Sequence, residues 1–397
     1  MAAPRLFALA LAAAASAAFA QLTERPLVRA LTDPAIEYAS RPTTDAVADL
    51  ARRVEAGSVQ LPFEDGTGYL RPVLDALNIP VESQMLVMSK TGVQGLHTGP
   101  ESPRAIYFDD AVTVGYIRGA PLLEFAVQDP RQGVILYTID QKPQARPQID
   151  RPSSCLRCHV AYNTLHVPGF IVRSQPIAPD GLPLGQFGTY DADDRTPFAK
   201  RWGGWYVSGA PDSLHHLGNA IAGKDAPPAF DPHGYLSTSS DIAALMVFEH
   251  QSHMTNLITR IGWESRLGAL QPDSVREFVD YLLFVDEQPL PAAIVGASAF
   301  ARRFEAQGPP DGRGRSLRQL DLHRRLLRYP CSYMIYSAAF RALPDAAREA
   351  IYARMWTILS GADPAPKYRA LEDADRRAVV EVLKDTVPDL PRAFTAS

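Results

Sequence analysis

The run AIYFDDAVTVGYI, residues 105–117, is the clearest sign of β-structure in the middle of the chain. It holds two short stretches rich in β-branched and aromatic residues on either side of Asp109-Asp110, which is typical of two strands with a turn between them. Similar runs follow at residues 122–127 and 134–139, and glycine, proline and aspartate punctuate all of them. The sequence therefore predicts a region rich in β-strands from residue 81 to about residue 207.

Helical patterns lie on both sides of this region. Residues 44–56 place apolar side chains at helical spacing, with Thr44 as the predicted cap and Gly57 as the stop, and a second helix is predicted at about residues 69–77. From about residue 239 the pattern is helical again, with predicted helices at 241–266, 274–284, 316–329, 346–359 and 373–384. These patterns predict an α+β fold, with a β-rich central region packed against a helical C-terminal half.

The first twenty residues have the pattern of a secretory signal peptide. Arg5 precedes an unbroken apolar run, residues 6–17, and Ala18-Phe19-Ala20 has the form of a cleavage site. The run is too short for a stop-transfer helix, and no later segment is apolar enough to span a membrane. We therefore expect cleavage before Gln21, a periplasmic or secreted location, and no membrane span in the mature protein.

The segment Cys155-Leu156-Arg157-Cys158-His159 has the C-x-x-C-H form in which a c-type haem is attached. Two thiols at this spacing can add to the two vinyl groups of one porphyrin, and the adjacent histidine then lies under the iron. A zinc site would need a second pair of soft ligands, but the chain has only one other cysteine, Cys331. The motif predicts one covalent haem c per chain, attached at Cys155 and Cys158, with His159 as an iron ligand.

These patterns divide the chain into four segments. Residues 1–20 are the predicted signal peptide, and residues 21–80 form a helical N-terminal segment. Residues 81–238 form the β-rich region, which contains the haem attachment site. Residues 239–397 form a helical region that we expect to merge with the preceding one into a single haem-binding unit.

The residue on the other side of the iron decides between electron transfer and small-molecule chemistry. The predicted helix at 241–266 places His250 and His253 on the same stripe as apolar residues such as Met246 and Leu257. We predict His250 as the second iron ligand. His253 is the alternative, and either histidine can instead support the site indirectly or lie in the core with polar partners.

Other candidates fall into three groups. Alternative sixth ligands are His216, which follows the predicted aromatic strand 202–207, and the thioethers of Met85 and Met88. Possible partners for haem propionates are His166, Arg173, Arg201 and Lys90. Cys331 is expected to be a buried small hydrophobe, and the crowded Asp191, Asp193 and Asp194 lack the rest of a calcium-loop pattern.

Composition adds two bounds. The net charge of −4 is spread over 397 residues, and no basic tail or stripe argues for nucleic acid as a partner. The chain is also several times longer than one haem requires, which calls for either a docking scaffold or an enclosed pocket.

Several segments together resemble a family of exported bacterial proteins that carry one c-type haem motif in a large α+β scaffold and are described as cytochrome c-like. The resemblance covers nearly all of the mature chain and rests on these segments: Tyr69–Gln94, Ser102–Phe108, the haem motif with Val167-Pro168-Gly169, Arg201–Val207, His216–Asn219, Glu249-His250-Gln251 and Tyr329–Tyr336. The family pattern continues with Met-His-Asn where this chain has Met254-Thr255-Asn256. This departure favours His250 over His253. The resemblance implies no particular reaction.

Two functions follow from these observations. In the first, the protein transfers electrons in the periplasm, and the extra chain is a scaffold that docks a redox partner protein. In the second, it is a haem enzyme of the peroxidase or small-molecule oxidase type, in which the helical half builds a distal pocket and His250 acts as acid/base catalyst. The single redox centre favours the first.

Overall fold

The computed structural model describes residues 30–224, 231–296 and 298–395. The predicted signal peptide lies outside these residues. A six-stranded antiparallel sheet forms the β-rich half, in the order in which its strands follow along the chain. Its strands are β1 (Met85–Val87), β2 (Arg104–Phe108), β3 (Val112–Ile117), β4 (Leu122–Asp129), β5 (Gly133–Asp140) and β6 (Ile149–Asp150). A separate pair consists of β7 (Arg173–Ser174) and β8 (Tyr190–Asp191).

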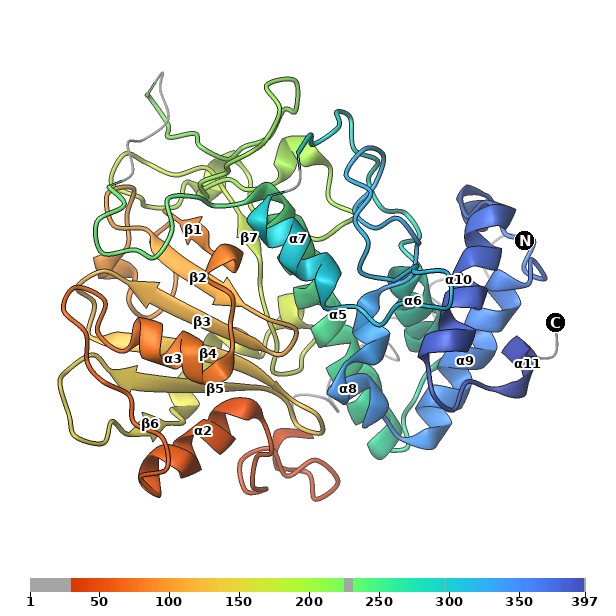
Figure 1. Cartoon of the computed structure of the whole chain (residues 1–397), viewed down its shortest axis with the longest axis horizontal. Coiled ribbons are helices and arrows are strands. Elements are labelled where there is room, and N and C mark those ends of the chain that lie inside the picture. The colour runs from red at the N-terminus through yellow and green to blue at the C-terminus, as the bar shows by residue number, and fades with distance from the viewer. Residues whose placement is uncertain (1–29, 225–230, 297, 396–397) are drawn as a thin grey trace, which may run out of the picture.

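The helices belong to two groups. Two precede the sheet, a short one carries the C-x-x-C-H motif, and the others follow residue 241. They are α2 (Ala46–Glu55), α3 (Leu70–Leu77), α4 (Leu156–His159), α5 (Ile242–Arg266), α6 (Pro272–Leu282), α7 (Ala299–Ala306), α8 (Ala338–Arg341), α9 (Asp345–Leu359), α10 (Asp373–Thr386) and α11 (Arg392–Thr395). Figure 1 shows the sheet on one side, the last helices on the other, and α5 between them. The predicted α+β fold is confirmed.

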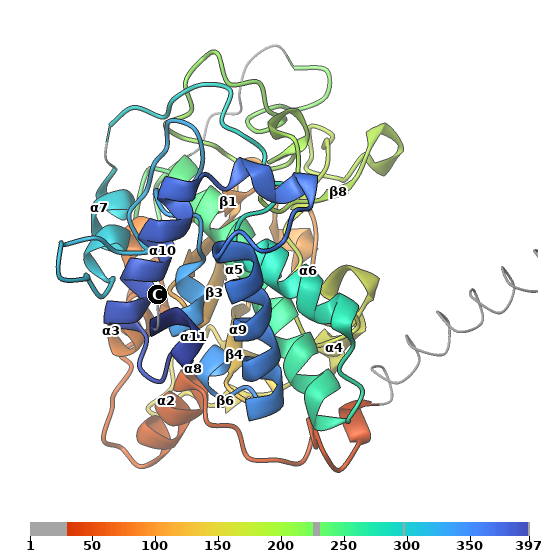
Figure 2. The same cartoon turned by 90° about the vertical axis from the view of Figure 1, so that its right-hand side faces the viewer.

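The two faces of the sheet differ in how they are covered. Side chains on one face, such as Tyr107, Val114 and Phe125, are fully buried and share a core with α2 and α3. On the opposite face, Met85 and Phe108 join the core of α5 and the C-terminal helices. Figure 2 shows these helices stacked in front of the sheet. The β-rich and helical regions therefore share one apolar core.

The centre of that opposite face is only partly covered. The register aligns Ile106 with Gly115 and Gly115 with Glu124, so these three residues point to the same side of the sheet. Arg104 and Ala126 lie on this side too, one pleat away, and all five residues are only half-buried. We call these five residues the open sheet face.

Three local predictions were wrong in ways that have physical causes. Helix α2 is capped by Asp45, whose carboxylate accepts hydrogen bonds from the Val47 and Ala48 N–H groups, and not by Thr44. Residues 316–329 are not helical, because the Asp321 carboxylate accepts the N–H groups two and three residues on and holds a turn there.

The aromatic segment 202–207 is also not a strand. Trp202 has a φ of 64° and Gly204 a φ of 79°, values that break extended backbone. Only Trp205 forms a bridge, to Val87. A Cβ on Gly203 would lie 2.8 Å from backbone atoms of Gln175, so only glycine permits this close approach of the two backbones.

Candidate functional site

Cys155, Cys158 and His159 lie on one short helical segment. Residues 153–155 form a 3-10 turn that runs directly into α4, because Cys155 itself has helical dihedral angles. Positions three and four apart in a helix share a face, so the two thiols and the imidazole project to one side. Neither thiol is in a disulfide, Cys158 is exposed and Cys155 is half-buried. Burial raises the pKa of the Cys155 thiol, and the nearby Glu124 carboxylate raises it further.

The imidazole of His159 is held in one tautomer. Its Nδ1 lies 2.8 Å from the carbonyl oxygen of Gly169. A carbonyl can only accept, so Nδ1 carries the proton and the lone pair on Nε2 is available. Burial lowers the pKa of His159, which favours the neutral imidazole. A neutral ring whose Nδ1–H is fixed by a backbone carbonyl is the form in which histidine binds metals.

The carbonyl that orients His159 is itself fixed by α5. The Asn256 side-chain amide, 1% exposed, accepts from the Phe170 N–H at 2.8 Å and donates to the Phe170 carbonyl at 2.8 Å. A Cβ on Gly169 would lie 2.2 Å from Asn256 Oδ1, so only glycine fits beside this amide. Asn256, Phe170, Gly169 and His159 thus form one continuous clamp.

The charged groups beside His159 come from the open sheet face. Arg104 and Glu124 are the two charges that act on its imidazole, and they lie 3.6 Å apart from each other. Among the described residues, the buried Arg104 Nε has no hydrogen-bond partner. Gly115, between them, has no side chain to fill the space. The motif helix therefore lies near a half-buried face that includes the guanidinium of Arg104, whose Nε makes an ion pair with Glu124 but no hydrogen bond.

This donor set fits the group that the sequence implies. Cys155 and Cys158 supply two free thiols on one helical face, and His159 supplies a neutral imidazole with an available Nε2. The Nε of Arg104, which makes an ion pair with Glu124 but no hydrogen bond, suits a propionate carboxylate, because a guanidinium matches a carboxylate geometrically. Sequence reasoning missed Arg104, since a single arginine at the start of a strand resembles ordinary surface charge.

His250 occupies a different environment from the one that we predicted. It is fully buried, its Nδ1 lies 2.9 Å from Asp194 Oδ2, and its Nε2 lies 2.7 Å from Ser332 Oγ. Its ring stacks on Tyr281 and Phe284, at centroid distances of 5.1 and 4.2 Å. Both nitrogens are used inside the protein, so in this arrangement His250 has no nitrogen free for iron. It matches the core alternative.

Asp194, His250 and Ser332 have the connectivity of a nucleophilic triad, but they lack access. Ser332 and His250 are 0% exposed, and neither lines a cavity among those found in the described residues. Ser332 Oγ also accepts the N–H of Met334 at 3.2 Å, as an N-cap does. The three residues therefore join α5 to two distant loops and are buried away from solvent.

Other segments of the family resemblance meet in the same buried region. Arg201 and Glu249 form an ion pair of 3.1 Å, with exposures of 2% and 0%. Gln251 accepts from the Tyr333 hydroxyl at 2.8 Å. Burial raises the pKa of Glu249 to about 8, and the Arg201 charge opposes that shift. These residues hold the two halves together.

The remaining predicted residues also have protein partners or are enclosed. Met85 and Met88 are fully buried, and His216 packs edge-on against Trp202 at 5.3 Å. Ion pairs join Arg173 to Asp191 and Lys90 to Asp180, both at 3.4 Å. Cys331 is fully buried, as predicted, and burial raises its pKa to about 12.

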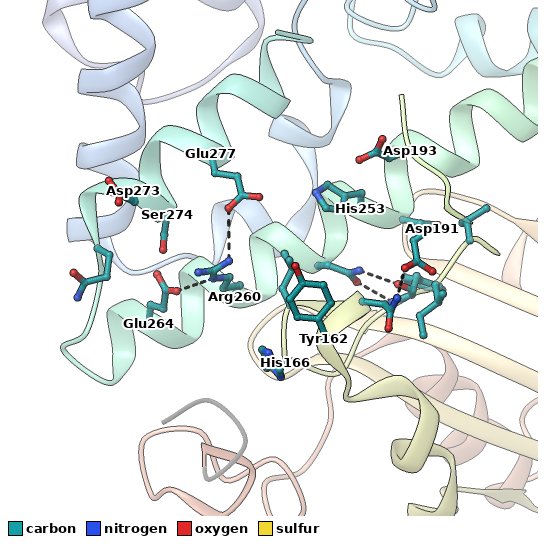
Figure 3. Close-up of a pocket in the computed structure, with 18 of the residues that line it drawn as sticks. Tyr162, His166, Asp191, Asp193, His253, Arg260, Glu264, Asp273, Ser274 and Glu277 are labelled. Carbon is teal, nitrogen blue, oxygen red and sulfur yellow. Dashed lines mark hydrogen bonds and ion pairs between the residues drawn. The ribbon is translucent and has the colours of Figure 1, made fainter. Parts of the chain in front are cut away.

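A cavity of about 730 Å³ lies between the segment after the motif, the loop before Arg195, and helices α5 and α6. In Figure 3, His253 lies between Glu277 and Asp193, and Arg260 faces Glu264 and Glu277. Other residues that line the cavity include Tyr162, His166, Phe170, Asp191, Ser252 and Asn256. The volume is in the range of small-molecule sites.

The cavity and the motif helix contact opposite ends of the same clamp. Phe170 and Asn256 line the cavity, whereas the Gly169 carbonyl next to them contacts His159. His253, predicted as the alternative iron ligand, therefore borders the cavity on the α5 side of this clamp. Burial lowers the pKa of His253, so its ring favours the neutral form beside the acidic residues.

Comparisons with protein families, with curated proteins and with solved structures gave no match. Within the described residues, no three His, Cys, Asp or Glu side chains are grouped so that they could hold a metal ion. Within the same residues, no helix has the length and apolar character needed to cross a membrane.

Proposed function

We propose that the protein is an exported carrier of one covalently bound c-type haem that exchanges electrons with a redox partner protein. The observation that carries this proposal is the state of His159: its Nδ1–H is bound to the Gly169 carbonyl, and its Nε2 is left with an available lone pair on the same helical face as two free thiols. The N-terminal signal pattern supports it, because haem c attachment in bacteria takes place outside the cytoplasmic membrane.

In this proposal each residue has a defined task. Cys155 and Cys158 would each form a thioether with the porphyrin, and His159 would bind the iron through Nε2. Asn256 and Gly169 keep the imidazole oriented, and Arg104 would pair with a propionate. When bound, the haem supplies one-electron exchange between ferric and ferrous iron.

The test is retention of haem through denaturing electrophoresis after export in a host with haem-maturation machinery. We expect wild type to keep its haem, and the double variant Cys155→Ala/Cys158→Ala to lose all of it. Cys331→Ala is the matched control, because it removes a thiol that the proposal does not use. Loss of haem from wild type, or unchanged haem in the double variant, contradicts the proposal.

The 730 Å³ cavity favours a second candidate, a haem enzyme of the peroxidase or oxidase type acting on a small molecule. The general acid/base would then be His253, which borders the cavity, and not His250. Turnover of hydrogen peroxide with a chromogenic electron donor separates the two. Activity that His253→Ala abolishes, with haem retained, supports the enzyme, and activity that is unaffected by this variant supports the carrier.

A further inference from the structure

The 91–98 loop, residues Thr91–Thr98, is attached to the rim of the open sheet face. Arg104 donates to the Thr91 carbonyl at 2.9 Å. The Gln94 side chain, 4% exposed, accepts from the Leu122 N–H at 2.9 Å and donates to its carbonyl at 3.1 Å. Leu122 lies two positions before Glu124, so the loop borders the side of the sheet near which His159 lies.

A glycine brings this loop close to Arg104. Gly92 has a φ of 83°, and a Cβ there would lie 2.7 Å from the Arg104 guanidinium. Any other residue would strain the backbone and displace the arginine. The loop, Arg104 and the motif helix are therefore parts of one local arrangement.

The same loop exposes apolar side chains that have nothing against them. Leu96 is 95% exposed and Val93 is 75% exposed, whereas Gln94 and Thr98, between and beside them, are buried. His97 is exposed, and neither of its ring nitrogens has a hydrogen-bond partner among the described residues. Large apolar groups exposed together on a loop that is otherwise fixed indicate a binding partner.

The other histidines lie elsewhere in the fold, and His216 packs against Trp202 at 5.3 Å. His250 has both nitrogens occupied, and His253 and His166 line the cavity on the α5 side of the clamp. His233 lies two residues before Tyr235, which packs against Tyr116 on the other face of the sheet. His97 is the histidine whose loop is bonded to the open sheet face.

We infer that His97 is the second axial ligand of the haem, and that Val93 and Leu96 pack against its porphyrin. This inference rests on the proposed function, since it assumes haem at Cys155, Cys158 and His159. The occupant of the apolar loop is therefore the haem of the same chain. Ligation by two imidazoles fills both axial positions, which suits electron transfer.

The test uses the full exported holoprotein and the variants His97→Ala, His97→Met and His323→Ala. The last removes an exposed histidine of the helical half and is the control. We expect low-spin spectra that resist carbon monoxide in wild type and in His323→Ala. His97→Ala should keep covalent haem but become high-spin and bind carbon monoxide. His97→Met should restore the low-spin state with a raised potential.

Two results overturn the inference while leaving the proposed function intact. One is a His97→Ala protein with the wild-type low-spin spectrum and the same resistance to carbon monoxide. The other is a wild-type protein that is already high-spin and binds carbon monoxide. Absence of covalent haem from wild type is a different failure, since it removes the proposed function itself.

Discussion

Replacing Asn256 by alanine tests the clamp that orients His159. The substitution removes two hydrogen bonds of 2.8 Å to the backbone of Phe170. An unsatisfied buried backbone group costs about 1–3 kcal/mol. Phe170 borders the cavity, so water can hydrogen-bond to its freed backbone groups and offset part of this cost. Alanine also has a higher helix propensity than asparagine, which stabilises α5 by about half a kcal/mol. The expected decrease in the free energy of unfolding is about 2 kcal/mol.

The clamp also predicts a spectroscopic effect that a purely structural role would not have. Without Asn256 the Gly169 carbonyl is free to move, so the His159 imidazole should lose its fixed orientation and the holoprotein spectrum should change. The assay is urea unfolding together with the optical spectrum. Asn219→Gly is the matched control, because Asn219 makes the same pair of 2.8 Å hydrogen bonds to Val207 at a φ of 64° that glycine accepts. A destabilised control with a wild-type spectrum is expected. An Asn256→Ala protein with wild-type stability and spectrum would refute the clamp.

Three other substitutions test the buried polar network. Arg201→Ala should lower the free energy of unfolding by about 1–3 kcal/mol, because it leaves the buried Glu249 carboxyl without its hydrogen-bond donor; a thermal midpoint close to that of wild type would contradict this. Burial raises the pKa of Glu287 from its ordinary 4.5 to about 8, so the unfolded state releases this proton first and stability should fall between about pH 5 and pH 8. Glu287→Gln should flatten that fall in urea midpoints, and an unchanged pH slope counts against it. Ser332→Ala should cost about 1–2 kcal/mol by leaving His250 Nε2 unpaired, and wild type should show no Ser332-dependent ester hydrolysis.

The fold was largely predictable because its signals are local. The strands within residues 105–117 follow from their runs of β-branched and aromatic residues, and helix α5 follows from the helical spacing of its apolar residues. The turn at Asp321 and the left-handed Trp202 depend on side-chain caps and close backbone contacts that periodicity does not report. For the same reason the residues 316–329 were predicted as a helix that does not form.

The candidate site was predictable only where it is contiguous in sequence. The motif residues Cys155, Cys158 and His159 are neighbours, so their common helical face follows from spacing alone. The prediction that His250 points inward was confirmed by its burial, but its partners lie 56 and 82 positions away and leave no visible pattern. Arg104 and His97 belong to different loops and strands, and only the tertiary structure brings their segments to one face.

Mass spectrometry of the denatured, exported wild-type protein after thiol alkylation tests the central claim most directly. We predict an intact mass increased by one haem, with a single alkylated cysteine, Cys331, which serves as the internal control because it is buried when folded and accessible when unfolded. Cys155 and Cys158 should be protected by their thioether bonds. A protein at the mass of the bare polypeptide, with all three cysteines alkylated, would contradict the account.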